Sequence, residues 1–216
     1  MLYQKSLYQT LQSHTNRGLD FLRDDIKSLT PEMKKEAEKI LSLESEILKF
    51  CKCILKKKIS ARKICINGDY HLGQVLNTGD DFMIIDFEGE PVRSPGERRL
   101  KFPAFRDVAG MVRSFHYAVY SVFFQRSKIR PEDTAIMQPW IEPWCYYITG
   151  AFLNSCMETV KSYDFVPEEK DELSILLNVF LIDKSIYEIG YELNNRPDWV
   201  IIPMQGIRLI MKEFLY

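Results

Sequence analysis

The sequence predicts a mainly α-helical domain with a small β element. Long stretches with apolar residues at helical spacing lie on both sides of a short central segment. Within that segment two apolar runs, Ile64–Ile66 and Phe82–Ile85, look like short buried strands. A chain of 216 residues with 46% apolar content can form one packed domain. We therefore expect a single domain with three segments: a helical lead-in (1–60), central loops (61–92) and a helical region (93–216).

The amino-terminal segment is expected to be helical throughout. Residues 1–29 suggest either one helix or two helices divided at Gly18. Thr30 and Pro31 are typical of a helix start, an N-cap followed by proline at the first position. A long amphipathic helix should then run to about Lys58, although Glu44 interrupts its repeat. It forms either a coiled coil or, as we favour, a helix packed against the central segment.

The second half of the chain predicts four further helices. Residues 93–105 are rich in proline, glycine and arginine and indicate an ordered loop. The expected helices start at Arg106, span 144–161 and 168–195, and start at Gly206.

Acidic residues follow both apolar runs. Asp69 comes after the first, and Asp86 and Glu88 come after the second. Acids at the ends of buried strands are costly unless a cation pairs with them. Together with Gln74 they offer only oxygen ligands, which suit magnesium rather than zinc or copper.

The order of these residues matches that of kinase-like phosphotransferases. In such enzymes a loop aspartate accepts a proton from a hydroxyl, while an amide a few residues on and a later aspartate hold the metal. Asp69, Gln74 and Asp86 occur in that order and at nearly that spacing. The alternative is two solvent-facing hairpin turns, because Asn-Gly and Gly-Asp are ordinary turn signals.

Two other polar features leave alternatives open. Asp107 either favours the dipole of its helix or accepts hydrogen bonds from the loop that contains Asp69. Four residues share one helical face at positions i, i+3, i+4 and i+7: Lys184, Tyr187, Glu188 and Tyr191. They form either a surface ion pair beside core-edge tyrosines or a sugar-binding stripe. His116 is expected to be a satisfied, half-buried histidine without chemistry.

Charge and cysteine usage exclude several functional classes. The net charge is −1, so neither nucleic acid nor an anionic membrane is an expected partner. The five cysteines form no CxxC pair and predict free thiols in a reducing cytoplasm. No stretch approaches the roughly 18 apolar residues of a membrane span, and we expect a cytoplasmic protein.

Several segments together resemble a known family. They are NGDYHLGQVL (67–76), FMIIDFEGEP (82–91), ERR (97–99), FRDVAGMVRSFHYA (105–118), GAFL (150–153) and DKSIYEIGYELNNRPDWVIIP (183–203). In this order they resemble the carboxyl-terminal lobe of bacterial maltokinases, aminoglycoside-phosphotransferase-like enzymes that phosphorylate maltose to maltose 1-phosphate with ATP and are often fused to trehalose synthase. The implied fold is the carboxyl-terminal lobe of a protein-kinase-like fold.

The resemblance also implies roles for individual residues, with ATP as phosphoryl donor and maltose or a related α-glucoside as acceptor. Asp69 would be the catalytic base, and His71 would position groups in the same loop. Magnesium would be held by Gln74, Asp86 and Glu88. Asp107 would brace the loop, and Asn67 would be structural at a position where the family usually has histidine. The sugar would contact Lys184, Tyr187, Glu188 and Tyr191.

Family members carry an amino-terminal lobe of strands that covers the nucleotide and supplies a lysine. Residues 1–60 instead predict helices without a glycine-rich loop. We therefore expect that lobe to be absent from these residues. The phosphotransferase would then be a fragment of a longer or fused enzyme, or would need a separate upper-lobe or trehalose-synthase-type partner chain. The alternative is a non-catalytic, pseudokinase-like sugar-binding or scaffold module.

Overall fold

The computed structural model describes residues 2–87, 89, 94–124 and 131–215. The chain forms two compact units. The first unit combines Met1–Ile59 with Lys170–Tyr216, and the second unit is Ser60–Glu169. The sequence predicts one domain with residues 1–60 as a lead-in, whereas in the structure this segment packs with the carboxyl-terminal helices.

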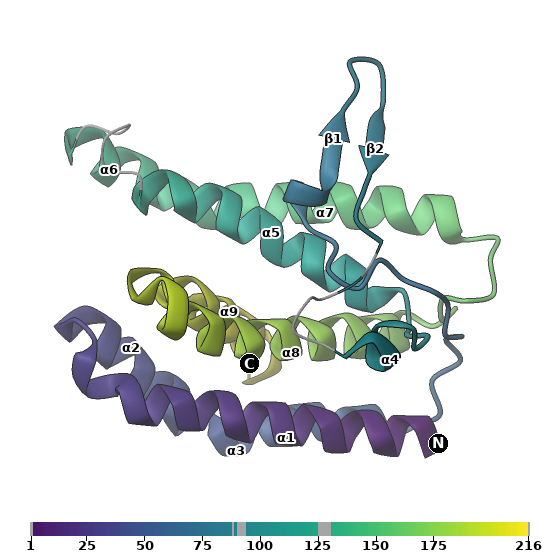
Figure 1. Ribbon diagram of the computed structural model, residues 1–216, viewed down its shortest axis with the longest axis horizontal. Helices are drawn as coiled ribbons and strands as arrows, with labels where there is room; N and C mark the ends of the chain where they lie inside the picture. The colour runs from purple at the N-terminus through teal and green to yellow at the C-terminus, as the bar shows by residue number, and fades with distance from the viewer. Residues whose placement is uncertain (1, 88, 90–93, 125–130, 216) are drawn as a thin grey trace. The chain divides into compact units, whose positions relative to one another are not determined.

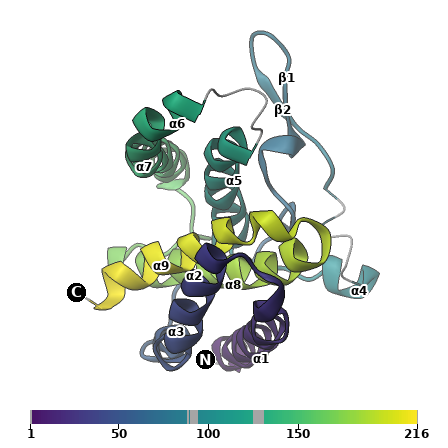
Figure 2. The ribbon, with the colours of Figure 1, turned by 90° about the vertical axis from the view of Figure 1, so that its left-hand side faces the viewer.

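The regular secondary structure in the described residues of the first unit is all helical (Figure 1). Its helices are α1 (Leu2–Asp25), α2 (Pro31–Ser42), α3 (Glu44–Lys52), α8 (Lys170–Asn195) and α9 (Ile201–Leu215). Short 3₁₀ turns connect them at Ile26–Ser28, Cys53–Leu55 and Pro197–Trp199. Helix α8 packs against both α1 and α9, and α2 and α3 also contact α9, as Figure 2 shows from a second side. Helices far apart in the sequence therefore share one core.

The amino-terminal helices confirm one predicted boundary and correct another. Thr30 caps α2, because its Oγ1 accepts a hydrogen bond from the Met33 amide at 3.3 Å. The predicted long helix to Lys58 is wrong: α2 ends at Ser42, and α3 begins after Leu43. Of the two alternatives for residues 1–29, the structure shows one α-helix without a break, since α1 continues through Gly18.

Gly18 is needed for the close approach of α1 to α8. A Cβ atom at this position would lie 2.5 Å from Ile186 Cγ2 and 3.0 Å from the Ile186 carbonyl oxygen. Both residues are in the core, where Ile186 is 1% exposed. A glycine inside a helix is therefore explained here by packing between helices.

We expect Gly18→Ala to lower the free energy of unfolding by about 1–3 kcal/mol, as is typical of overpacked cores. Gly150→Ala in α7 is the matched control, because a Cβ there meets nothing within 4 Å. The control should be neutral or stabilising by up to about 1 kcal/mol, since alanine favours helix over glycine. Urea denaturation measures both, and equal midpoints for the two variants would contradict the packing argument.

The second unit combines a β-hairpin with helices. Strands β1 (Val75–Asn77) and β2 (Phe82–Ile84) pair antiparallel, with Val75 opposite Ile84. The helices of this unit are α4 (Pro95–Arg98), α5 (Phe105–Phe124), α6 (Pro131–Met137) and α7 (Ile141–Val160). Helix α5 packs on α7, where the rings of Phe115 and Phe152 meet edge to face at 5.4 Å. The hairpin projects away from these two helices (Figure 1).

The prediction of two buried strands is wrong for the first run, whereas for the second run the strand is confirmed and its burial is wrong. Ile64–Ile66 is not a strand, since Ile64 forms only an isolated bridge with Phe102. Phe82–Ile84 is a strand, but its side chains are 68%, 55% and 42% exposed. Among the described residues the sheet has only the two strands of this hairpin, so each strand has one unpaired edge.

The later helices mostly confirm the sequence. Helix α8 ends where the Asn-Asn-Arg-Pro stop was predicted, and α5 begins one residue before Arg106. Helices α7 and α9 begin earlier than predicted because Pro143 and Pro203 lie in their first turns, where proline loses no helical hydrogen bond. No helix in the described part of the chain is long and apolar enough to cross a membrane.

Candidate active site

Asn67 joins the two acidic loops of the second unit. Its side chain is buried, at 5% exposure. Asn67 Nδ2 donates to the carbonyl oxygens of Ile85 and Asp86 at 3.2 and 3.1 Å. Asn67 Oδ1 accepts from the Asp69 amide at 3.1 Å. One amide side chain thus connects the backbones of Asp69 and Asp86, which the sequence separates widely.

The carboxylate of Asp107, in the first turn of α5, holds the start of the first loop. Asp107 Oδ2 accepts from the Asn67 amide at 2.7 Å, and Oδ1 accepts from the Gly68 amide at 2.9 Å. Gly68 has a φ of 89°, which glycine adopts without strain. Of the two interpretations that the sequence leaves open for Asp107, this geometry shows the contact with the loop.

Burial raises the pKa of the Asp107 carboxyl above its ordinary value. The amides of Gly68 and Asn67 and the guanidinium of Arg106 act in the opposite direction, while the nearby Asp69 raises the pKa further. Burial also raises the pKa of the Tyr70 hydroxyl, with smaller contributions from Cys156 and Asp107. This part of the unit therefore disfavours additional negative charge.

Asp69 and His71 lie close together in the first loop. The Asp69 carboxylate, with its side chain 19% exposed, is 3.8 Å from His71 Nε2. His71 Nδ1 accepts a hydrogen bond from the Gly73 amide at 3.0 Å, so the neutral ring carries its proton on Nε2. The His71 proton therefore faces the Asp69 carboxylate.

Two of the predicted metal ligands are in direct contact. Gln74 Nε2 donates to Asp86 Oδ2 at 2.9 Å, and the Gln74 carbonyl accepts from the Ile85 amide at 2.9 Å. Asp86 has a φ of 59°, a left-handed conformation that aspartate tolerates better than most residues and that often marks functional sites. Glu88, the third predicted ligand, lies outside the described residues. Among the described residues no three His, Cys, Asp or Glu side chains cluster as a metal site.

Helix α5 contacts the first loop at two further positions that the sequence interpretation missed. A Cβ at Gly110 would lie 2.7 Å from the Tyr70 carbonyl oxygen, so glycine lets the loop approach the helix. Ser114 Oγ accepts from the Leu72 amide at 2.9 Å. The spacing of Asp107, Gly110 and Ser114 on one helical face is the signal that could have indicated these contacts.

His116 on the same helix is neutral and structural. Its Nδ1 lies 2.8 Å from Nη1 of Arg113, which is 1% exposed. Burial, followed by the nearby Arg113 charge, lowers the pKa of His116 to about 3. Since arginine can only donate, His116 Nδ1 accepts.

The four predicted sugar-contacting residues all lie on α8, in the first unit. Lys184 Nζ is 5.1 Å from the centre of the Tyr187 ring, and Glu188 is buried at 7% exposure. Tyr191 is 45% exposed, with the Arg196 guanidinium 5.6 Å from its ring. The structure places these residues in a different unit from Asp69, and their contact with sugar stays a prediction.

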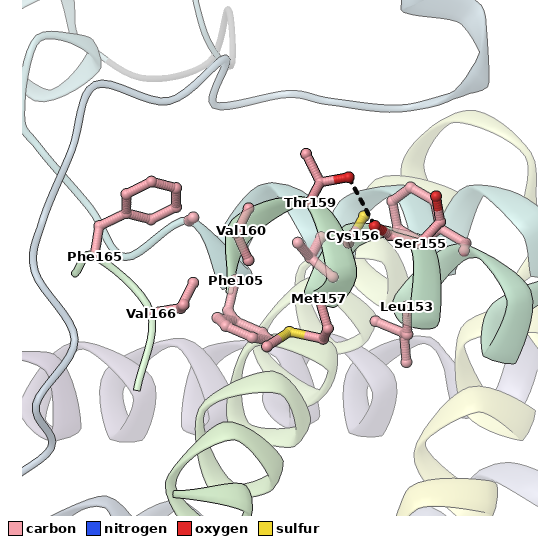
Figure 3. Close-up of a pocket in the computed structure, with 12 residues that line it drawn as sticks. Phe105, Leu153, Ser155, Cys156, Met157, Thr159, Val160, Phe165 and Val166 are labelled. Atoms are coloured by element: carbon pink, nitrogen blue, oxygen red, sulfur yellow. Dashed lines mark hydrogen bonds between the residues drawn. The ribbon is translucent and has the colours of Figure 1, made fainter. Parts of the chain in front are cut away.

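An apolar cavity of about 280 Å³ lies in the second unit beside the start of α5 (Figure 3). Phe105 and Val108, which flank Asp107, are part of its wall, and Cys156 contributes from α7. Figure 3 shows mostly carbon and sulfur on the labelled side chains, and the Thr159 hydroxyl is engaged with the Ser155 carbonyl at 2.9 Å. The cavity supplies no charged group to the loops.

The chain is similar in sequence to bacterial sugar kinases. A glucosamine kinase from Streptacidiphilus jiangxiensis is 26% identical over 152 residues, which are 70% of this chain and 32% of that protein. A glucosamine kinase from Mycolicibacterium smegmatis is 29% identical over 152 residues, or 68% of this chain and 34% of that protein. The chain thus spans about a third of the length of these curated relatives. No protein-family model matches the chain.

Solved structures show the same likeness in the fold. A glucosamine kinase in complex with glucosamine, ADP and inorganic phosphate matches with a TM-score of 0.71 at 21% identity, over 96% of this chain and 49% of that one. Crystal form A of a glucosamine kinase matches with a TM-score of 0.72 at 22% identity, over 96% and 48%. The chain therefore has the fold of about half of a sugar kinase. These relatives are glucosamine kinases, and neither a maltokinase nor a trehalose synthase is among them, so the finer resemblance to maltokinases is not supported.

Proposed function

We propose that this chain is the part of an ATP-dependent sugar kinase that carries the catalytic carboxylate, and that its acceptor is an amino sugar of the glucosamine type rather than maltose. The connection that Asn67 makes between the Asp69 and Asp86 loops carries the proposal. It holds a proton-accepting carboxylate and a metal-binding carboxylate in one unit, and phosphoryl transfer to a hydroxyl needs both. The glucosamine kinases among the relatives support the sugar class.

Asp69 is proposed to orient the acceptor hydroxyl and to take its proton as the oxygen attacks the terminal phosphate. Its carboxylate is only partly exposed, and its backbone is fixed through Asn67. His71 would position Asp69 from the same loop. The protein would thus hold the Asp69 carboxylate in a fixed orientation before the acceptor binds.

Gln74 and Asp86 fit a magnesium ion. They bring the buried amide of Gln74 into contact with the exposed carboxylate of Asp86, and magnesium is commonly bound by one or two carboxylates with substrate phosphates completing its shell. When bound, the ion would neutralise charge on the transferred phosphate. The described residues of 1–60 are helical or irregular, so we propose that further ATP contacts come from polypeptide outside these 216 residues, such as an upper-lobe partner.

The acceptor is proposed to contact the α8 face formed by Lys184, Tyr187, Glu188 and Tyr191. Glucosamine carries an ammonium group near neutral pH, and a carboxylate such as Glu188 can pair with it. Tyrosine rings suit the apolar faces of a sugar, and Tyr191 is exposed enough to be reached. Maltose carries no charge and gains nothing from Glu188 as an ion partner.

Calorimetric titration with glucosamine, with maltose and with Mg-ATP tests the proposal. We expect glucosamine to bind at least about tenfold more tightly than maltose, the difference that one charge-assisted contact gives. Glu188→Gln should remove this preference, and Asp86→Ala should weaken Mg-ATP binding. The exposed residues Glu38 and Asp80 provide the controls. Glu38→Gln and Asp80→Ala should change neither the preference for glucosamine nor the affinity for Mg-ATP.

Phosphorus NMR of the same mixtures distinguishes the enzyme from a binding module. A sugar phosphate formed from glucosamine and Mg-ATP supports the kinase. The part of a glucosamine kinase that this chain does not match can be added as a second polypeptide. If the chain binds sugar but no sugar phosphate forms even then, it is a non-catalytic sugar-binding module. Equal affinity for both sugars would overturn the choice of acceptor, and no binding at millimolar concentration would overturn both functions.

A further inference from the structure

We propose that Ser114 is a positioning residue for the Asp69 loop, and that Gly110 and Ser114 together fix the distance between this loop and α5. The inference rests on the proposed function, because the position of the loop matters through the proton that Asp69 takes. Neither residue touches the reacting groups in this account. Both act through the loop backbone.

The geometry of α5 supports the proposal. Residues 107, 110 and 114 are at i, i+3 and i+7, so they share one face of the helix. Their separation along the axis is about 10 Å at 1.5 Å per residue. Along this face the loop is held at its start by Asp107, approaches closely at Tyr70, and is held again at Leu72 by Ser114. Asp69 and His71 lie between the fixed points.

Ser114 holds the end of the loop that Asp107 does not reach. Its Oγ accepts the Leu72 amide at 2.9 Å, one residue after His71. Without that bond the Leu72 amide loses its hydrogen bond to α5, while hydrogen bonds within the turn, such as that of the Gly73 amide with His71 Nδ1, remain. The Asp69 carboxylate and the His71 ring would then lose their fixed relation to α5.

Gly110 sets how close the loop can lie. An added Cβ would come within 2.7 Å of the Tyr70 carbonyl, which is backbone and cannot rotate away. A methyl group at position 110 must therefore push residues 69–71 away from the helix. This displacement acts on the loop without removing any hydrogen-bonding group.

Hydrogen exchange of the full chain, followed residue by residue by NMR, tests the proposal directly. In Ser114→Ala we expect the Leu72 amide to exchange about tenfold faster, the change that loss of one hydrogen bond gives. Amides within α5 should be unchanged, and Ser114→Thr should restore the rate because it keeps the Oγ acceptor. Ser121→Ala is the matched control on α5, since Ser121 Oγ only donates to the Ala118 carbonyl of its own helix.

Kinetics separate positioning from a general structural role. For Ser114→Ala and Gly110→Ala we expect kcat for sugar phosphorylation to fall by about tenfold or more with KM for both substrates unchanged, because a small misplacement of a catalytic group lowers the chemical step. Gly150→Ala is the control for the effect of replacing a helical glycine in this unit, because a Cβ there meets nothing within 4 Å, and kcat should be unchanged.

Unchanged Leu72 exchange in Ser114→Ala, or failure of Ser114→Thr to restore it, would overturn the proposal whatever the activity. Faster exchange in Ser114→Ala, with no phosphorylation by the wild type even after the remaining length of a glucosamine kinase is added as a second chain, would support the positioning of the loop and overturn the kinase activity alone.

Discussion

Asp69→Asn is expected to lower kcat for sugar phosphorylation by about 10²–10⁴-fold, the usual contribution of a positioned general base. Asparagine has the same shape but does not accept a proton. The hydrogen bond from the residue 69 amide to Asn67 Oδ1 involves the backbone and should persist. Sugar affinity and the free energy of unfolding should therefore change little.

A coupled assay of ADP release gives kcat, and urea denaturation gives stability. Asp80→Asn, at an exposed position in the turn of the hairpin, serves as the control and should retain full activity. An Asp69→Asn variant with wild-type kcat would exclude Asp69 as the base.

The sequence predicted best the elements whose signals are local. Thr30 followed by Pro31 marks a helix start in any context, and the structure shows the cap. The turn at Leu43 has no glycine or proline, so only the interruption of the repeat at Glu44 indicated it. Gly18 looked like a break because helix propensity disfavours glycine, whereas its contact with Ile186 depends on a helix far along the chain.

The exposure of the hairpin shows the same limit. Phe82, Met83 and Ile84 form an apolar run, and such runs usually indicate burial. Burial depends on what covers a strand, and only β1 pairs with this one among the described residues. The apolar run could therefore predict the strand but not whether other elements pack on it.

The order of Asp69, Gln74 and Asp86 predicted a chemistry, but the contacts that organise the loops could not be predicted in the same way. The hydrogen bonds of Asn67 depend on two loops meeting in space, and those of Ser114 on α5 lying beside the first loop. The order of these residues also gave no information on the sugar, because the predicted catalytic and metal-binding residues act on the hydroxyl and the phosphate that all such acceptors share. This explains why the resemblance suggested maltose while the relatives are glucosamine kinases.

Asp107→Ala is expected to lower the free energy of unfolding by about 2–4 kcal/mol, because it leaves two partly buried amides, those of Asn67 and Gly68, without their acceptor. Asp171→Ala is the matched control, since Asp171 is an exposed acid in the first turn of α8. If Asp107 acted only through the helix dipole, the free energy of unfolding would fall equally in both variants, by about 1 kcal/mol or less. Urea denaturation of the two variants distinguishes these roles.

The pH dependence of Asp107→Asn gives an independent check. Burial raises the folded-state pKa of Asp107 above its ordinary value, so the folded chain holds this proton more tightly than the unfolded chain. The resulting stability is fully present below the unfolded pKa and is lost as the pH rises through the folded pKa. Asparagine does not titrate, so the wild type should lose stability relative to Asp107→Asn across this window. The test compares the stability of the wild type and of Asp107→Asn as a function of pH. A constant difference between the two would show that burial does not shift the pKa of Asp107. A wild type that gains stability across this window would show that the amide partners outweigh burial.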